Sequence, residues 1–227
     1  MRKGLSAVMI AVGLVLFGGV AQGIQYQLDY LIETQTPILL GDKVFGDWTS
    51  SGCVDPSLIW VMVPDDPSGG YWIQFRGPFV ASANNPICDT GIFYSLGTVN
   101  GQPRISDIEQ AFNLTGGGGI ISIGETVWSD GFFQGQVIAQ STVGWNLPGS
   151  DPIDPPGEWC QGDNLLINPP VAKVWVTKDI YVQSFGGVLG ATIIRQGFSQ
   201  VPDGGLTVLM LGAGMAGLAM LGRKLRW

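Results

Sequence analysis

Acidic side chains are the groups in this sequence with the most chemistry to offer. The chain of 227 residues contains no histidine, which excludes Ser-His-Asp and Cys-His catalysis and any metal held by imidazole. No serine stands in the G-x-S-x-G turn that exposes a nucleophile. Carboxylate chemistry is what remains to be considered.

The densest acidic stretch is "DPIDPPGEWCQGD". Its carboxylates are the candidate calcium ligands, and these are Asp151, Asp154, Glu158 and Asp163. Oxygen ligands gathered in one loop can hold Ca²⁺, but the spacing matches no EF-hand loop and the prolines constrain the backbone. We therefore interpret the stretch as a solvated acidic loop and expect neither a metal nor a cofactor.

Tryptophan and acid pairs suggest sugars as a second kind of ligand. Glu125 and Asp130 flank Trp128, and two carboxylates on either side of a substrate are what a glycosidase uses. Such a trio is too common to identify an enzyme, and we predict none. The tryptophans that could stack on a sugar are Trp48, Trp72, Trp128, Trp145 and Trp159. A tryptophan in a β-protein more often fills the core, and this is our expectation for any single one.

The motif "GAGMAG", residues 212–217, has the G-x-G-x-x-G spacing of a dinucleotide site. That site needs a preceding strand and an acidic residue about 20 positions later, whereas only ten residues follow Gly217 and none is acidic. The glycines lie in an uncharged stretch, 204–222, long enough as a helix to cross a hydrocarbon core of about 30 Å. The basic residues that follow it are Arg223, Lys224 and Arg226. We predict a membrane helix with these cations on the cytoplasmic side.

Residues 1–23 predict a secretory signal peptide. Arg2 and Lys3 precede an apolar stretch, residues 5–17, and small residues follow it, which is the layout of a cleaved export signal. An uncleaved anchor helix is the alternative. Both ends therefore place the body, residues 24–200, outside the cytoplasm.

The body carries 17 acidic and 6 basic residues, a net charge of −11. Phosphates would be repelled by such a surface, so we expect no nucleic-acid partner. The cysteines are Cys53, Cys88 and Cys160. In an oxidising compartment they allow one disulfide with three pairings, of which we favour Cys53–Cys88.

Short alternating segments separated by Gly/Pro turns fill the body. In "IQYQLDYL" the apolar residues Ile24, Tyr26, Leu28 and Tyr30 fall on one face of a strand. Similar runs recur between turns such as "PDDPSGG", "NGQP" and "TGGGG". We predict an all-β ectodomain, a single antiparallel β-sandwich that is jelly-roll-like. The stretch "RISDIEQAFNL" fits a helix or a strand equally well.

The tail "VPDGGLTVLMLGAGMAGLAMLGRKLRW" resembles the PEP-CTERM class of exosortase-sorted bacterial proteins, and it is most similar to the variant with a Val-Pro-Asp-Ser-Gly signature. Val201, Pro202, Asp203 and Gly205 match that signature, and Gly204 stands where the variant has serine. The tail divides into a sorting motif at 201–205, a helix at 206–222 and a basic end at 223–227.

Pieces of the body also resemble ectodomains joined to such tails: "GDKVFGDW", "CDTGIFYSL", "ISDIEQAFNLTGGGGIISIGETVW" and "VWVTKDIYVQSF". The resemblance favours a strand for "RISDIEQAFNL". It implies export through the secretion translocon, recognition in the inner membrane by an exosortase-like enzyme, and transfer to the surface of a Gram-negative, biofilm-forming bacterium. We therefore predict a non-enzymatic surface or matrix protein associated with exopolysaccharide. The alternative is a carbohydrate-binding or carbohydrate-cleaving β-sandwich delivered by the same tail.

Overall fold

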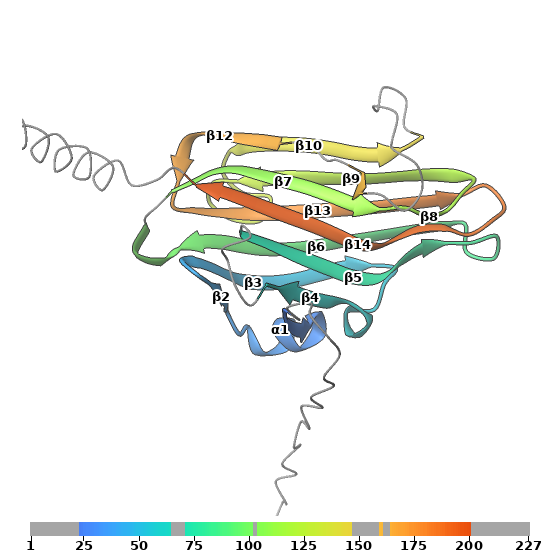
Figure 1. The fold of residues 1–227 in the computed structure, drawn as a ribbon, viewed down its shortest axis with the longest axis horizontal. Coiled ribbons are helices and arrows are strands. Elements are labelled where there is room, and N and C mark those ends of the chain that lie inside the picture. The colour runs from blue at the N-terminus through green and yellow to red at the C-terminus, as the bar shows by residue number, and fades with distance from the viewer. Residues whose placement is uncertain (1–22, 65–70, 102–103, 147–158, 161–163, 201–227) are drawn as a thin grey trace, which may run out of the picture.

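Two antiparallel sheets lie face to face in the computed structural model, which describes residues 23–64, 71–101, 104–146, 159–160 and 164–200. The sheet named here the β14 sheet has the order β1-β4-β5-β14-β7-β11, with β8 also beside β14 and β12 also beside β7. The other, the β13 sheet, has the order β10-β9-β13-β6-β3-β2. Strands of one sheet cross over those of the other in Figure 1. The predicted antiparallel β-sandwich is confirmed at this level, and its jelly-roll-like character stays a prediction.

The bounds of the described elements follow the chain. They are β1 (Ile24–Gln27), α1 (Leu28–Thr34), β2 (Ile38–Leu40), β3 (Lys43–Gly52), η1 (Pro56–Leu58), β4 (Trp60–Val63), β5 (Tyr71–Ala81), β6 (Ile87–Thr98), η3 (Val99–Gly101), β7 (Ile105–Asn113), β8 (Thr115–Gly116), β9 (Gly119–Trp128), β10 (Val137–Trp145), β11 (Trp159–Cys160), β12 (Asn164–Val171), β13 (Lys173–Ser184) and β14 (Leu189–Gln200).

The core lies between the sheets and follows from period-two alternation. Along β9 every second residue is buried, including Ile121, Ile123 and Val127, while the residues between them are half-buried on the outer face. Successive side chains of a strand point to opposite faces, so this pattern fixes which face meets the other sheet. Fully burying one such aliphatic side chain contributes about 1.5–3 kcal/mol.

Aromatic rings join the two sheets at the centre of the core. The ring of Tyr94 on β6 lies 5.5 Å from that of Trp48 on β3 and 5.7 Å from that of Phe75 on β5, between ring centroids. Phe45 on β3 similarly contacts Phe198 on β14 at 5.4 Å. Offset and tilted ring pairs at these separations each add about 0.5–1.5 kcal/mol beyond area burial. The core position expected for a tryptophan is confirmed for Trp48, which is 1% exposed.

The helix α1 corrects the prediction of one long strand from residue 24 to residue 31. The strand ends at Gln27, and Leu28 and Leu31 are buried together on one helical face. Leu28 and Leu31 are three residues apart, a spacing that fits one face of a helix, whereas the alternation of residues 24–30 fits a strand. As a helix, the segment places both leucines in the core. Gln35 ends α1 in the left-handed conformation and donates its backbone N–H to the carbonyl of Leu31 at 2.9 Å. The helix lies at the lower edge of the sandwich in Figure 1 and packs against β3 and η1.

The ambiguous stretch at residues 104–114 forms the strand β7, as the resemblance favoured. Ile105, Ile108 and Phe112 are fully buried in it. Gln110 is buried on the same strand at 3% exposure, so β7 also carries a polar side chain into the core.

A disulfide joins Cys53, just after β3, to Cys88 on β6, with Cα atoms 5.5 Å apart. This is the pairing favoured from the sequence. The predicted signal peptide lies at residues 1–23, nearly all outside the described ranges. The predicted sorting motif, membrane helix and basic end at 201–227 lie wholly outside them. Within the described ranges no helix has the length and apolar character needed to span a bilayer.

Candidate functional site

A groove lies on the outer face of the β13 sheet, and the register of three strands determines which residues form it. Asp179 on β13 stands opposite Gly91 on β6 and Gly124 on β9. Since side chains alternate along β13, Asp179 points outward whereas Lys178 and Ile180 are buried. Gly124, without a side chain, leaves a hollow on one side of Asp179, and on the other side the Phe93 ring lies against Gly91.

The hollow is part of a cavity of about 700 Å³, named here the outer groove. It lies within the range of about 300–1,000 Å³ typical of small-molecule sites. Hydroxyl and amide side chains line much of it, and these are Ser51, Ser122, Thr126, Gln140, Thr142 and Thr177. Such groups both donate and accept hydrogen bonds, so the outer groove suits a ligand rich in hydroxyls.

Aromatic rings line the outer groove beside these hydroxyls. The ring of Phe133 lies 5.6 Å from that of Phe93 and 5.7 Å from that of Trp128, between centroids. The indole N–H of Trp128 donates to Thr177 Oγ1 at 3.1 Å, which holds the ring in place. Phe133 is 65% exposed, so it offers apolar surface to a ligand.

The turn between β9 and β10 is closed by its own hydrogen bonds, which hold Phe133 in position. The backbone N–H of Ser129 donates to the carbonyl of Gln136 at 3.0 Å, and Ser129 Oγ accepts from the N–H of Gln136 at 2.9 Å. Phe133 itself has a φ of 58°. A positive φ is unusual for a bulky residue and is often found at ligand sites.

Two carboxylates lie together in the outer groove. Burial raises the pKa of the Asp179 carboxyl, and the Asp89 carboxyl raises that pKa further through a hydrogen bond and like-charge repulsion. Carboxylate oxygens accept hydrogen bonds, so the pair can accept from the hydroxyls of a ligand.

On the same face of the sheet, the Lys173 side chain covers the ring of Trp175. Trp175 pairs with Trp128 across β13 and β9, but Lys173 lies over its ring with Nζ 4.6 Å from the centroid. Lys173 also forms an ion pair with Asp47 at 3.0 Å. The hydrogen bond from Lys173 lowers the pKa of the Asp47 carboxyl and outweighs burial, which raises it. Trp175 is therefore less available to a ligand than Trp128.

The five tryptophans considered from the sequence do not form one platform. Trp128 lies in the outer groove, Trp48 is in the core, and Trp145 packs against the core. Trp72 is on β5 of the other sheet, where Arg195 lies 4.9 Å from its ring centroid. Trp159 belongs to β11, and its side chain is outside the described part of the structure.

The acid pair considered from the sequence is not formed. Glu125 points into the core at 1% exposure, whereas Asp130 is exposed in the turn after β9. All four candidate calcium ligands lie at residues 147–158 and 161–163, outside the described ranges. Among the described residues, no three Asp, Glu, Cys or His side chains gather as a metal site requires.

Sequence reasoning missed the residues that make the groove, namely Phe93, Phe133, Asp89, Asp179 and the two glycines. The alternation in "KVWVTKDIYV" already places Asp179 on the face opposite the valines, which is the available signal. The convergence of β6, β9 and β13 depends on register, which one sequence does not show.

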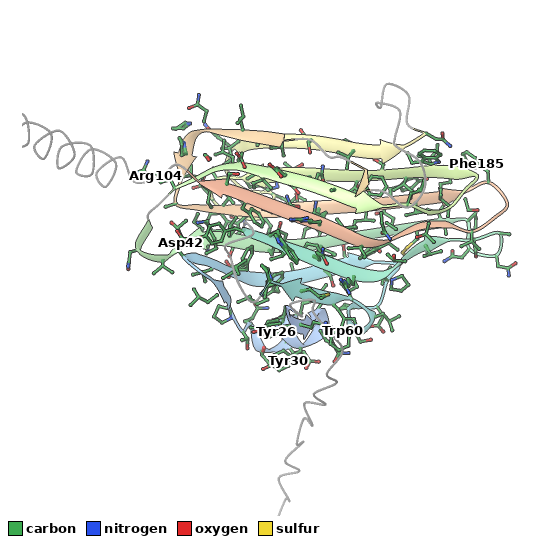
Figure 2. The ribbon with its side chains drawn as sticks, in the orientation of Figure 1. Tyr26, Tyr30, Asp42, Trp60, Arg104 and Phe185 are labelled. Atoms are coloured by element: carbon green, nitrogen blue, oxygen red, sulfur yellow. A yellow bond between two sulfur atoms is a disulfide. The ribbon has the colours of Figure 1, made fainter. Side chains whose placement is uncertain are left out.

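Other exposed aromatic residues lie away from the outer groove. Tyr30 and Trp60 are 46% and 41% exposed, and they lie with Tyr26 at the lower edge beside α1 (Figure 2). Phe185 is at the opposite end of the sandwich from Arg104. None of these residues lines the outer groove.

No protein-family model and no curated protein matches the sequence. Among solved structures, the chain is similar to TmCBM61 in complex with β-1,4-galactotriose, at 17% identity over 75% of this chain and 94% of that one, with a TM-score of 0.34. It is similar to a structure of promiscuous carbohydrate-binding modules from the β-sandwich superfamily, at 13% identity over 75% and 60%, with a TM-score of 0.34. The enzymatically active domain of bacteriophage CBA120 tailspike protein 4 matches at 13% identity over 67% and 19%, with a TM-score of 0.30.

Proposed function

We propose that this chain is an exported, non-enzymatic surface protein whose outer groove binds glycan. The observation that carries the proposal is the meeting, in one cavity, of the Phe133 and Trp128 rings, the Asp89–Asp179 pair and a lining of hydroxyls. Aromatic surface and a few placed polar groups are what a site for a small polar ligand requires. A pyranose presents both an apolar face and hydroxyls, so it matches both parts of the groove.

The carboxylate pair supports binding in preference to hydrolysis. Retaining glycosidases separate their two carboxyl groups by about 5–5.5 Å, and inverting ones by about 6.5–9.5 Å. Asp89 and Asp179 lie close enough together for Asp89 to raise the pKa of Asp179, so they lie side by side and do not flank a bound sugar. The pair is thus suited to holding sugar hydroxyls.

Charge limits the class of glycan. Asp89 and Asp179 are the acidic side chains that line the groove, and the ammonium of Lys178 is turned into the core, 2.7 Å from Glu125. Uronate or sulfate groups would be repelled by the two carboxylates. Neutral glycans and amino sugars are therefore the proposed ligands, with an exopolysaccharide as the natural source.

A comparison of two tryptophan variants tests the binding site. Wild type, Trp128→Ala and Trp72→Ala are applied to immobilised neutral, amino-sugar and uronate oligosaccharides. We expect wild type and Trp72→Ala to bind the same neutral or amino glycans and Trp128→Ala to lose about tenfold in affinity. Equal loss in both variants, binding to uronates alone, or release of cleaved sugar would contradict the proposal.

The route to the surface is proposed from the sequence of the tail. Pro202 interrupts regular structure ahead of the apolar stretch, and the charge of Asp203 stays at the membrane boundary. An exosortase-like membrane enzyme would recognise this motif by residue type and by depth. The Cys53–Cys88 disulfide fits an oxidising compartment.

Pro202→Ala with Asp203→Ala tests this route in the native host. We expect export to continue and processing to stop, so that the precursor accumulates in the inner membrane at its unprocessed mass. Gly217→Ala, inside the apolar stretch, serves as the control and should be processed. Delivery of the double variant to the surface at wild-type mass would show that the motif is only a turn.

A further inference from the structure

A lysine is fully buried between the two sheets, where the glycan site does not use it. Lys178 is 0% exposed. Its Nζ donates to Glu125 Oε2 at 2.7 Å and to Gln110 Oε1 at 2.9 Å. Glu125 is its cross-strand partner on β9, whereas Gln110 belongs to β7 of the opposite sheet. The amine therefore bridges the sheets, 68 residues away from Gln110 in sequence.

The amide of Gln110 is held with its carbonyl toward the amine. Its Nε2 donates to Ser141 Oγ at 2.6 Å and to the carbonyl of Ile123 at 3.4 Å. Lysine nitrogen only donates, so the oxygen is the atom that must face it. A carbonyl bond measures about 1.23 Å, which places Gln110 Cδ within about 4.1 Å of Nζ. Reacting atoms in a near-attack arrangement lie about 3–3.5 Å apart, so the step requires Nζ to move toward Cδ by roughly 1 Å or less.

Glu125 is the proton carrier that such a reaction needs. Its Oε2 contacts the amine, and its Oε1 accepts from Gln196 Nε2 at 3.2 Å. It is 1% exposed. A carboxylate within hydrogen-bonding distance of a nucleophile can act as its base.

We propose that Lys178 and Gln110 condense to an amide cross-link between the two sheets. Proton transfer from the Lys178 ammonium to the Glu125 carboxylate frees the amine, and Nζ attacks Gln110 Cδ. In the tetrahedral centre Nζ carries two protons and a positive charge, and one of these protons passes to Nε2 on the same carbon, while Glu125 keeps the first proton. The Cδ–Nε2 bond breaks, ammonia leaves, and the new Nζ–Cδ bond remains. One C–N bond replaces another, so no oxidant or other reactant is needed.

The fold supplies what an uncatalysed amine and amide lack in water. Both groups are fixed by neighbouring strands, and such intramolecular placement is equivalent to a very high local concentration. The site is buried, so hydrolysis of the intermediate by water is suppressed. An ordinary buried ion pair involves only Lys178 and Glu125. The condensation also uses the amide carbonyl of Gln110, which faces the same nitrogen.

Peptide mass mapping of the full chain tests the cross-link, whatever the processing of its ends. The purified folded protein is digested with trypsin and a second protease. We expect a branched peptide that joins the segments of Gln110 and Lys178, with a mass lower than their sum by one ammonia and with no tryptic cleavage after Lys178. Quantitative recovery of the two linear peptides from folded wild type after prolonged incubation would overturn the proposal, as would Gln110 found only as glutamate.

Two variants separate the chemistry from the fold. Glu125→Gln keeps the size and hydrogen bonds of the side chain but cannot carry the proton, so it should yield linear peptides with an unchanged circular dichroism spectrum. Glu109→Gln makes the same change at an exposed position of β7 and leaves all three reacting groups present, so the branched peptide should still form. Cross-linking in Glu125→Gln at the wild-type extent would contradict the role of Glu125. The wild-type result alone decides the cross-link if a variant fails to fold.

Discussion

Consecutive residues of β13 lie in two opposite environments. Lys178 faces the dry space between the sheets, where Glu125 and Gln110 bind its amine. Asp179 faces the outer groove beside Asp89. One side therefore pairs opposite charges away from water, and the other brings like charges together within reach of a ligand. The alternation of a single strand thus places a buried polar cluster on one face and an open groove on the other.

The largest expected effect is on the free energy of unfolding and comes from removing one partner of the buried Lys178–Glu125 pair. Glu125→Ala leaves Lys178 buried without its carboxylate, and loss of one partner of a buried pair costs about 3–5 kcal/mol. We expect the free energy of unfolding to fall by this amount in urea titrations. Glu33→Ala, at an exposed position of α1, should change it by less than about 0.5 kcal/mol.

A double replacement sharpens that result. Glu125→Leu with Lys178→Met removes both charges, and well-packed apolar replacements of buried pairs are often neutral. Measured against wild type in which peptide mapping shows Lys178 and Gln110 uncondensed, the double variant should recover most of the stability lost by Glu125→Ala. If Glu125→Ala alone unfolds no more easily than Glu33→Ala, the buried side is not the polar site described here.

An intermediate effect is expected from the exposed aromatic side chains. Phe133 and Phe185 are 65% and 64% exposed, yet only Phe133 lines the outer groove. Phe133→Ala should weaken glycan binding about tenfold, since an aromatic contact is worth roughly 0.5–1.5 kcal/mol. Phe185→Ala should bind as wild type does, measured by isothermal titration calorimetry. Equal binding by both variants would remove the aromatic rings from the site.

The smallest effect concerns the outer carboxylates and pH. Because the pKa of Asp179 is raised in the folded protein, its contribution to stability is complete below the ordinary range of aspartate and is lost as pH rises through the raised pKa. Asp179→Asn removes this loss. We expect its melting temperature to exceed that of wild type by about 1–3 °C at neutral pH, the scale of exposed charge pairs.

The same difference should vanish in acid, where both proteins carry a neutral group at this position. Scanning calorimetry at several pH values measures it. A melting temperature lower than wild type at neutral pH would show that Asp179 is stabilised as an anion.

Alternation and turn residues predicted most of the sandwich, because apolar and polar residues alternate along a half-buried strand. They misassigned α1, where Leu28 and Leu31 fit both periods. They also did not predict that Lys178 is buried, since a lysine in an alternating strand ordinarily lies on the solvent-exposed face. A buried polar site depends on partners from other strands, and these become visible only with the fold.

The outer groove was beyond sequence reasoning for a related reason. Asp89, Phe93, Trp128 and Asp179 come from three strands, and their meeting depends on registers set by the whole sandwich. Trp128 was among the residues considered, but tryptophans on other faces were equally good candidates. Only the register distinguishes Trp128 from Trp72.

The most direct test of glycan binding in the outer groove is to introduce a side chain at Gly124, which partly fills the groove. Gly124, in the groove, and Gly97, on β6 outside it, both leave room for a side chain, since an added Cβ would meet its nearest atom at 3.7 and 3.8 Å. We would measure, by isothermal titration calorimetry, the affinity of Gly124→Val and Gly97→Val for the best neutral or amino oligosaccharide bound by wild type. We expect Gly124→Val to lose binding by tenfold or more, about 1.4 kcal/mol, and Gly97→Val to retain it. Wild-type affinity in Gly124→Val would show that glycan does not bind in the outer groove.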